Sequence, residues 1–260
     1  INGPGGIKDV KFQWDSVKIN FGFIDEYENL RPLVSGKGNL ERFDFWLNQF
    51  KYLEAFEKLA CLVGSFNKEA KDMTTLKDKD KVNAAREKLI PLVKQEAAEL
   101  YDIHKYLISS VTTWGSLGNI TNWQQHNIPG QILPQIKQII SITEDSSWVA
   151  GLFPENIPEV SRIIVPSPQT MIQEGNDYTV KVICYNIKPE TAGIFWRLFG
   201  NKEYQQADLK KISETYWMAT IPSVSITGDF EYYIRIDDGK EFLFPASAPF
   251  VNQAVVKIKD

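Results

Sequence analysis

The chain has 260 residues, 43% of them hydrophobic and 24% charged, a composition that is typical of folded globular proteins and excludes wholesale disorder. Its net charge of −4 gives no electrostatic reason to expect nucleic acid or an anionic membrane surface as a partner. No run of about 18 apolar residues occurs, so we expect no span of a membrane. The length is sufficient for two domains of ordinary size.

Residues 1–36 are expected to form an extended N-terminal segment. Gly3–Gly6 has the Gly and Pro content of a loop. The apolar residues of Val17–Phe23 then alternate with polar or small ones, which is the period of a half-buried strand. Because a lone strand is not stable by itself, it would pair with a later sheet, pack on helices or end an upstream domain. We interpret the start at Ile1, in place of Met, as the start of a piece of a longer protein.

An α-helical domain is predicted over residues 37–152. Its clearest helix covers 39–64, with Asn39 as the N-cap and Gly64 as the end. The charged segment Asn67–Lys81 is typical of a solvated loop or a frayed helix start. The predicted buried stripe of the first helix contains Phe43, Trp46, Leu47, Phe50, Leu53, Phe56, Ala60 and Val63, while Phe45 and Tyr52 lie off it and are candidates for contact with another domain.

The rest of this domain is predicted to hold two or three further helices in an antiparallel bundle. Residues 82–112 form a long helical stretch in which Pro91 would introduce a kink or a first turn. Trp114–Gly118 breaks the pattern. Asn119–His126 is a candidate short helix, and Pro129–Ile140 a last amphipathic one.

The composition then changes from helical to strand patterns. The segment 153–168 contains four prolines, which end helices and stiffen a connection, so we place a linker there. From residue 169 to 260, short β-branched and aromatic runs alternate with turn signals, which indicates an antiparallel β-sandwich. The predicted strands cover residues 178–185, 194–198, 204–209, 215–221, 230–236 and 251–258. The fold class expected for the whole chain is therefore multidomain α and β, a helical bundle followed by an immunoglobulin-like sandwich.

The second half resembles the immunoglobulin or fibronectin type III-like modules that are appended to bacterial carbohydrate-active enzymes. The resemblance covers roughly residues 160–260 and is carried by Ile194–Arg197, Tyr216–Pro222 and above all Gly228–Ile234. Such modules fill their core with a Trp or Tyr of the third strand and anchor a corner through one tyrosine. The resemblance implies a core that contains Trp196, Tyr216, Phe230 and either Tyr232 or Tyr233.

The first half is similar to a helical region that precedes such a sandwich in large secreted polysaccharide-degrading glycoside hydrolases of Bacteroidetes and Planctomycetes. The similarity is carried by Gly38–Tyr52 and Leu117–His126. It implies that a catalytic barrel lies upstream and that the protein is secreted, periplasmic or on the outer surface. An upstream catalytic domain or a polysaccharide is the partner that it implies.

The segment from Trp114 to His126 combines aromatic rings with side-chain amides. Flat rings stack on sugars and amides form paired hydrogen bonds with hydroxyl groups. The candidate contacts to a carbohydrate or to another domain are Trp114, Asn119, Asn122, Trp123, Gln125 and His126. The simpler interpretation is a polar turn between helices, in which both Trp fill the core and the amides cap backbone groups.

No catalytic residue is predicted within the chain. Asp25, Glu26 and Glu28 follow an apolar stretch, but neighbouring acids on a strand point to opposite faces and cannot act together on one glycosidic bond. Glu231 is expected at the rim of the sandwich, and no nucleophile is evident near His126. With two histidines and no Cys/His group, we expect neither a zinc site nor a cofactor.

The two cysteines occur in different halves of the chain. Cys61 lies in a helical pattern and Cys184 in a strand pattern, so we favour two buried free thiols over a disulfide.

The hypothesis that these patterns favour is a non-catalytic accessory or scaffolding region of a secreted polysaccharide-degrading enzyme, which positions or buttresses a catalytic domain. Two alternatives stay open. One is an independent carbohydrate-binding protein, and the other is a glycoside hydrolase with its site between the two domains. An exposed apolar patch on the helical side would favour the first, a row of exposed Trp or Tyr the second, and a cleft with two facing carboxylates the third.

Overall fold

The structure is a computed structural model that describes residues 7, 10–154 and 157–259. The chain divides into two compact units. The helical unit comprises Ile1–Pro32, Phe45–Ser110 and Gly115–Ile157, and the β unit comprises Leu33–Asp44, Val111–Trp114 and Pro158–Asp260. The predicted class of a helical region followed by an antiparallel sandwich is confirmed. The expected loop Gly3–Gly6 lies outside the described residues.

The segment that alternates around Val17–Phe23 is helical, so the prediction of a strand there was wrong. It contains α1 (Trp14–Val17), the 3-10 turn η2 (Lys18–Phe21) and α2 (Phe23–Asn29), followed by η3 (Arg31–Leu33). A helix forms its backbone hydrogen bonds internally, whereas a strand here would need a partner. Seven residues of alternation do not outweigh the packing of α2, whose Ile24 is buried.

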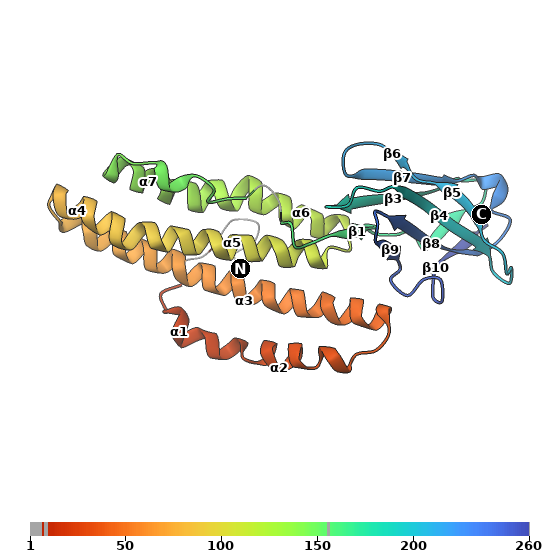
Figure 1. Cartoon of the computed structure of the whole chain (residues 1–260), viewed down its shortest axis with the longest axis horizontal. Helices are drawn as coiled ribbons and strands as arrows, with labels where there is room; N and C mark the ends of the chain where they lie inside the picture. Colours follow the sequence, from red (N-terminus) through yellow and green to blue (C-terminus); the bar gives the residue numbers. More distant parts are fainter. Residues whose placement is uncertain (1–6, 8–9, 155–156, 260) are drawn as a thin grey trace. The chain divides into compact units, whose positions relative to one another are not determined.

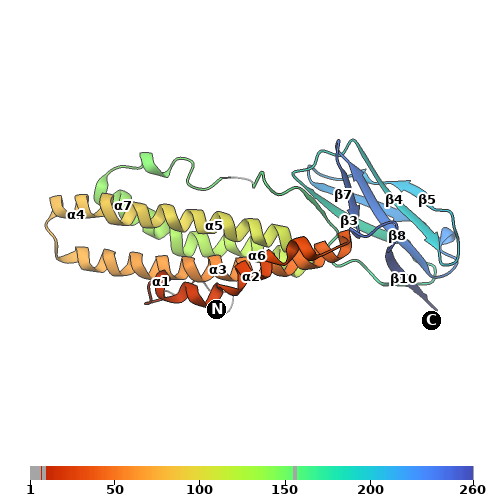
Figure 2. The ribbon, with the colours of Figure 1, turned by 60° about the horizontal axis from the view of Figure 1, so that its bottom comes forward.

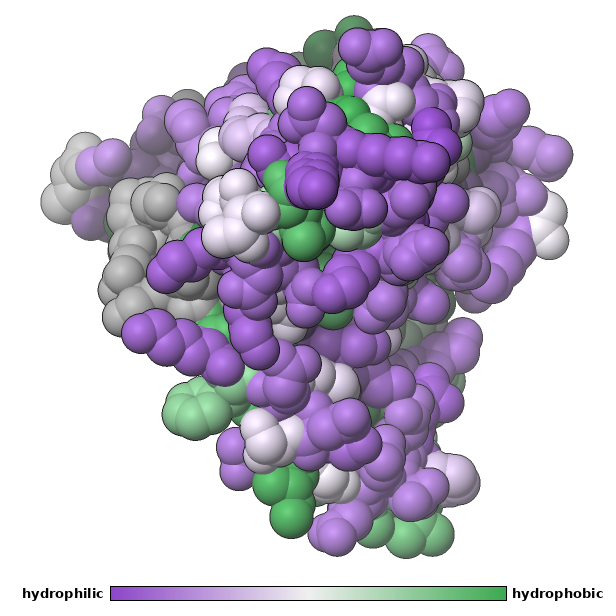
Figure 3. Space-filling model, turned by 90° about the vertical axis from the view of Figure 1, so that its left-hand side faces the viewer, coloured by the Kyte–Doolittle hydropathy of each residue, from purple (hydrophilic) through white to green (hydrophobic). Residues whose placement is uncertain are grey.

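Helix α3 (Lys37–Asp72) runs through Gly64, so Gly64 is not the end of the helix as predicted. The Val10 N–H donates to the Ala60 carbonyl at 3.2 Å, and a Cβ on Gly64 would lie 1.9 Å from the Val10 carbonyl oxygen. The glycine is therefore needed because another backbone segment touches the helix at this point. The turn η4 (Met73–Thr75) follows, and α4 begins at Asp78 within the charged segment, on a surface that Figure 3 shows as mainly hydrophilic.

The second helical stretch is continuous but changes its pitch before Pro91. It consists of α4 (Asp78–Ala84), the π-helical turn η5 (Ala85–Leu89) and α5 (Ile90–Ser110). Proline lacks an N–H and its ring collides with the carbonyl four residues earlier. A wider turn just before Pro91 relieves that collision without ending the helix.

Residues Trp114–Thr143 also form one continuous helical stretch, so the break predicted at Trp114–Gly118 was wrong. Helix α6 (Trp114–Asn122) leads through the π-helical segment η6 (Trp123–Ile132), which contains Pro129, into α7 (Leu133–Thr143). Glycine lowers helix propensity by about 1 kcal/mol, which tertiary packing overrides. After α7 the chain leaves the helix at Glu144, which has a φ of 53°, and forms the short turn η7 (Ser147–Val149).

In the helical unit, α3 lies beside α5, and α2 runs along α3 (Figures 1 and 2). The buried core is drawn mainly from α3, α5, η6 and α7, which carry the apolar stripes. Its largest fully buried side chains are Leu59, Phe66, Leu89, Leu100, Ile103, Ile132 and Ile139. Within the described residues, no helix is both long and apolar enough to cross a membrane.

The β unit is a sandwich of two sheets. One has the order β1-β3-β7-β6 and the other β2-β10-β8-β4-β5, with β9 paired to β8. Reading along the chain, these are the A-B-E-D and G-F-C orders of immunoglobulin-like domains, with β2 added in parallel beside β10. The strands are β1 (Arg162–Ile164), β2 (Met171–Gln173), β3 (Tyr178–Tyr185), β4 (Thr191–Leu198), β5 (Gln205–Asp208), β6 (Lys210–Lys211), β7 (Tyr216–Ile221), β8 (Phe230–Asp237), β9 (Glu241–Phe244) and β10 (Gln253–Ile258), with the turn η8 (Ser223–Ser225) after β7.

The core between the sheets follows the period of two. Trp196, Phe230 and Tyr232 are buried as the resemblance implied, whereas Tyr233 lies on the opposite face of β8. Tyr216 is half-buried and therefore not a full member of the core. Cys184 is buried here, and Cys61 in the helical unit, and both thiols are free, as predicted.

The helical and β units separate between Ile157 and Pro158, within the segment 153–168. Two stretches that precede this segment in the chain, Leu33–Asp44 and Val111–Trp114, also belong to the β unit. The β unit is thus assembled from three pieces of sequence, which strand patterns alone do not reveal.

Candidate functional site

The candidate residues between Trp114 and His126 do not all belong to the same unit. Trp114 belongs to the β unit and is 46% exposed. The other candidates belong to the helical unit, where Asn119, Gln125 and His126 are exposed and Asn122 is half-buried. The segment is therefore two separate features, an indole of the β unit and a row of polar side chains on α6 and η6.

Trp123 packs into the helical core and is 3% exposed. Its ring meets Phe56 edge-on, with the centroids 5.7 Å apart. It also forms a hydrogen bond with the side chain of Tyr52, whose pKa burial raises. This indole fills the core, in the way that the simpler interpretation of the segment describes.

The acidic residues Asp25, Glu26 and Glu28 lie on α2 instead of at a strand end. The Lys51 ammonium donates a hydrogen bond to the Glu28 carboxylate at 2.7 Å and forms an ion pair with it. Asp25 acts electrostatically on Glu54 of α3, whose pKa is raised first by burial and then by this neighbour. These acids therefore extend an ionic surface that α3 and α5 share.

On that surface the mostly buried acid Glu99 faces a lysine. Lys58 and Glu99 are 2.6 Å apart, and burial raises the pKa of Glu99 against the opposing effect of Lys58. Burial and the nearby carboxylates raise the pKa of Tyr106 to about 12. Ion pairs of this kind are typical of a structural network.

Glu96 is the most deeply buried carboxyl group among those described, with no exposed surface. The side-chain nitrogen of Gln135 donates to its carboxyl at 2.5 Å. Burial raises the pKa of Glu96 to about 8, against the smaller effect of Gln135. The carboxyl is therefore neutral at neutral pH, a state that an apolar environment favours.

An aromatic face lies over α2 and the first half of α3. Phe50 contacts Phe23, Tyr27 and Trp46, with ring centroids 5.3, 5.5 and 6.2 Å apart. Trp46 is 54% and Phe23 46% exposed, and Leu53, two turns after Trp46 on α3, is also exposed. Trp46 and Leu53 were predicted to be buried, which was wrong because α3 has a second apolar side that α2 covers only in part.

A second aromatic group lies on the outer face of the five-stranded order β2-β10-β8-β4-β5. Phe195 and Tyr233 stack with centroids 4.9 Å apart and planes 7° apart, and Tyr204 meets Tyr233 edge-on. The Arg197 guanidinium lies 4.3 Å from the Tyr204 centroid and binds Glu231 at 2.6 Å. We call this group the sheet platform. Glu231 is thus half-buried in an ion pair and not a free acid of the rim.

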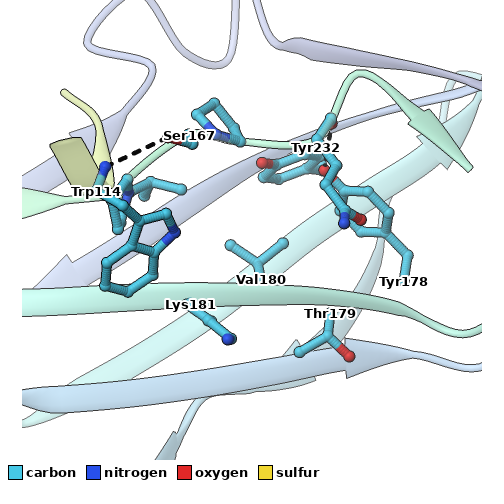
Figure 4. Close-up of a pocket in the computed structure, with 11 residues that line it drawn as sticks. Trp114, Ser167, Tyr178, Thr179, Val180, Lys181 and Tyr232 are labelled. Carbon is cyan, nitrogen blue, oxygen red and sulfur yellow. Dashed lines mark hydrogen bonds between the residues drawn. The ribbon is translucent and has the colours of Figure 1, made fainter.

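A small pocket opens in the β unit beside Trp114 (Figure 4). It is bounded by the segment Val165–Gln169 on one side and by the first half of β3 on the other. Tyr178, buried at its base, donates a hydrogen bond from its hydroxyl to the Gln169 carbonyl at 2.7 Å. Tyr232 also lines the pocket. Its buried hydroxyl forms no hydrogen bond of good geometry within the described residues, and the neighbouring Tyr178 side chain is the group that acts on it.

Among the described residues, no group of three or more His, Cys, Asp or Glu side chains is arranged to hold a metal ion. No known family model matches the sequence, and no curated protein matches it significantly. One solved structure, an engineered protein from the Northeast Structural Genomics Consortium, shares 12% sequence identity and aligns over 66% of this chain with a TM-score of 0.31. The alignment spans 46% of that protein's length, and at this TM-score it carries no argument about fold or function.

Sequence reasoning missed several of the residues that define these features. Glu96 stands three residues after Val93 and four before Leu100, on the predicted buried stripe, so its position already marked it as a buried acid. Lys181, Ser167 and the buried hydroxyl of Tyr232 gave no such signal, since only the packing of the sandwich brings them to one pocket.

Proposed function

We propose that this chain is a non-catalytic accessory region of a secreted polysaccharide-degrading enzyme, which positions or buttresses a catalytic domain. The observation that carries the proposal is the aromatic face of the helical unit. Trp46 and Phe23 each leave about half of their surface exposed around the Phe50 ring. Large rings that stay exposed side by side mark surfaces for protein contact, and Trp contributes strongly when such a surface is covered.

The arrangement of charges supports a scaffold over an active site. Glu28 and Glu99 are paired with Lys51 and Lys58, and the same two lysines act on Glu54 against the effects of Asp25 and Glu99. Ion pairs that join neighbouring helices in this way are typical of a structural surface. The partner that fits the aromatic face is a protein surface with an apolar centre, which in this proposal belongs to the catalytic domain.

The test begins with the complete gene product that contains this sequence. Any polysaccharide-degrading domain that it encodes is produced separately, and its binding to this chain is measured by calorimetry. Trp46→Ser is expected to weaken binding roughly 30-fold, the effect of losing a central Trp contact of about 2 kcal/mol. Val224→Ser is the matched control, because Val224 is 86% exposed but belongs to the β unit.

The proposal fails if the gene product contains no polysaccharide-degrading domain. It also fails if Trp46→Ser and Val224→Ser bind that domain equally well. In both cases the aromatic face would have another use.

Carbohydrate binding by the sheet platform is the second candidate function. The parallel stack of Phe195 on Tyr233, with Arg197 above Tyr204, offers flat rings next to hydrogen-bond donors on the outer face of the sheet. All of these side chains are half-buried, so the available ring surface is limited. Loss of glycan-array binding in Tyr233→Ala, with binding retained in Val224→Ser, would favour this candidate over the first.

A further inference from the structure

A pocket opens in the β unit where the last strand of the sandwich is interrupted. Strands β9 and β10 pair with successive parts of the same edge of β8, and residues 245–252, the β9–β10 loop, leave the sheet between them. The loop approaches the start of α3 so closely that a Cβ on Gly38 would lie 3.1 Å from the Ser247 Cβ. Between these two walls is a cavity of about 540 Å³, within the roughly 300–1,000 Å³ of pockets that bind small molecules.

The pocket carries positive charge without a counter-charge. Lys37 and Arg42 line it, and no acidic side chain does so among the described residues. Neither cation forms an ion pair within the described part of the chain. Glu41, which precedes Arg42 in the sequence, acts instead on Arg162 of β1. A cavity that is lined by one sign of charge attracts ligands of the opposite sign, so this pocket favours an anion.

Hydrogen bonds hold the Arg42 guanidinium beside the cavity. Its Nη2 donates to the Asn39 Oδ1 at 2.5 Å, and the Asn39 Nδ2 donates to the Ser35 carbonyl at 2.8 Å. The other terminal nitrogen, Nη1, would lie 3.9 Å from a Cβ on Gly38, which is the point where Ser247 of the opposite wall approaches. A guanidinium has several further N–H donors in one plane, and a carboxylate matches them with two parallel hydrogen bonds.

The β9–β10 loop adds an aromatic ring to the same pocket. Phe250 lines the pocket and is 93% exposed, so its ring surface is almost entirely free. The backbone below it is held in place, because the N–H groups of Phe250 and Val251 donate to the Ser247 carbonyl at 3.1 and 3.2 Å. The Ser247 hydroxyl donates to the Val251 carbonyl at 3.0 Å and can still accept a hydrogen bond. A flat ring next to hydrogen-bonding groups suits the ring of a sugar.

We propose that this pocket binds an acidic sugar, a pyranose whose carboxylate is held by Arg42 and Lys37 and whose ring stacks on Phe250. A neutral sugar would leave both cations unpaired, and a small inorganic anion would leave the aromatic ring unused. All the residues of this site belong to the β unit, apart from the aromatic face of the helical unit and from the sheet platform. The proposal therefore does not rest on the accessory role.

The test is an NMR titration of the whole chain, followed at the Arg42 Nε–H and the Phe250 backbone N–H. The probes are sodium D-glucuronate and sodium D-galacturonate, with methyl β-D-glucopyranoside as the neutral sugar and inorganic phosphate as the plain anion. A dissociation constant on the order of 1 mM is expected for at least one of the two acids, and binding at least about tenfold weaker for the neutral sugar and for phosphate.

Two variants, each with a matched control, locate the site. Arg42→Gln is expected to weaken binding of the acid about tenfold or more, because a charged hydrogen-bond donor is lost. Phe250→Ser is expected to weaken it about fivefold, because the stacking surface is lost. Arg235→Gln removes the same charge from β8, and Phe199→Ser removes a half-exposed ring from the same unit, so both should bind as the unchanged chain does.

The comparison of ligands on the unchanged chain needs no variant, so it decides the proposal even if a substitution disturbs the fold. The proposal is overturned if neither acid binds more tightly than the neutral sugar, or if phosphate binds as tightly as the acids. It is also overturned if Arg42→Gln and Arg235→Gln bind the acid equally well. A chain that docks on a catalytic domain through Trp46 but binds neither acid would refute this proposal and leave the proposed function intact.

Discussion

Replacing Glu96 by glutamine is expected to stabilise the helical unit in a pH-dependent way. The carboxyl has no exposed surface, and burial raises its pKa from 4.5 to about 8. The folded state therefore holds a proton that the unfolded state releases between these two pH values. By linkage, the free energy of unfolding falls as pH rises through that window, by about 1.4 kcal/mol for each pH unit.

The size of the effect follows from the width of the window. The pKa of Glu96 differs by about 3.5 units between the unfolded value of 4.5 and the folded value of about 8. The free energy of unfolding is therefore lower by at most about 5 kcal/mol once the pH exceeds 8. The loss is absent below the unfolded pKa, where Glu96 is protonated in both states. Glutamine has a similar shape and no charge, and its amide can keep the contact to Gln135. Glu96→Gln should therefore be as stable as the unchanged chain in acid and more stable than it at high pH.

The assay is urea unfolding followed by far-UV circular dichroism, which reports mainly the helices, at about pH 4 and about pH 9. Glu87→Gln, an exposed substitution on the same helical stretch, controls for the loss of one charge. If Glu96→Gln and Glu87→Gln differ by less than about 0.5 kcal/mol at the higher pH, Glu96 is not a buried neutral carboxyl and the reasoning is wrong.

Three further predictions concern single contacts. Gly64→Ala should destabilise the helical unit by about 1–3 kcal/mol, since its Cβ would overlap the Val10 carbonyl. Gly118→Ala places its Cβ in open space on α6 and should stabilise the unit by up to about 1 kcal/mol. A thermal unfolding temperature that shifts in the same direction in both variants would contradict this. Tyr178→Phe should lower the free energy of unfolding of the β unit by about 1 kcal/mol, because the hydrogen bond to Gln169 is lost. Tyr232→Phe should leave that free energy unchanged or raise it, because its hydroxyl forms no hydrogen bond of good geometry among the described residues. An equal loss of stability in the two variants in urea unfolding would be inconsistent with this difference. Arg197→Lys should lower the free energy of unfolding of the β unit by roughly 1 kcal/mol although the charge is kept. The reason is that the guanidinium stacks on Tyr204 and directs two nitrogens at the Glu231 carboxylate. An unchanged unfolding curve would show that charge alone matters at this position.

The helical half shows where sequence patterns reach their limit. The apolar spacing of 39–64 and 82–112 predicted the two long helices, because a buried stripe with the period of a helix is a local property. The ends and interruptions were predicted less well. Gly64 and the glycines of Trp114–Gly118 look like stops when read locally, but Gly64 serves a contact with Val10 that is distant in sequence. The segment Val17–Phe23 alternates like a strand and is nevertheless helical, because a helix forms its backbone hydrogen bonds internally and a strand needs a partner.

The candidate sites divide in the same way. The sequence identified Trp114 as an aromatic of interest by its residue type. The resemblance to immunoglobulin-like modules implied a sandwich core of Trp196, Tyr216, Phe230 and either Tyr232 or Tyr233, and of these Trp196, Phe230 and Tyr232 are buried. The sequence could not separate Trp114 from Trp123, which lie nine positions apart on one helical stretch but belong to different units. It also assigned Trp46 to the core, because the sequence does not show that α2 leaves this face of α3 partly uncovered.

The sequence by itself determined the class of each half, the main strands and helices, the free state of the two cysteines and the alternation that fills the sandwich. These follow from short-range patterns, in which each residue's neighbours along the chain decide which side chains face inward. Tertiary structure alone decided which apolar surfaces stay uncovered and where a pocket opens. The exposed Trp46 and the pocket beside Trp114 both arise where distant segments meet, because burial there depends on which elements pack together and not on the residues that flank each position.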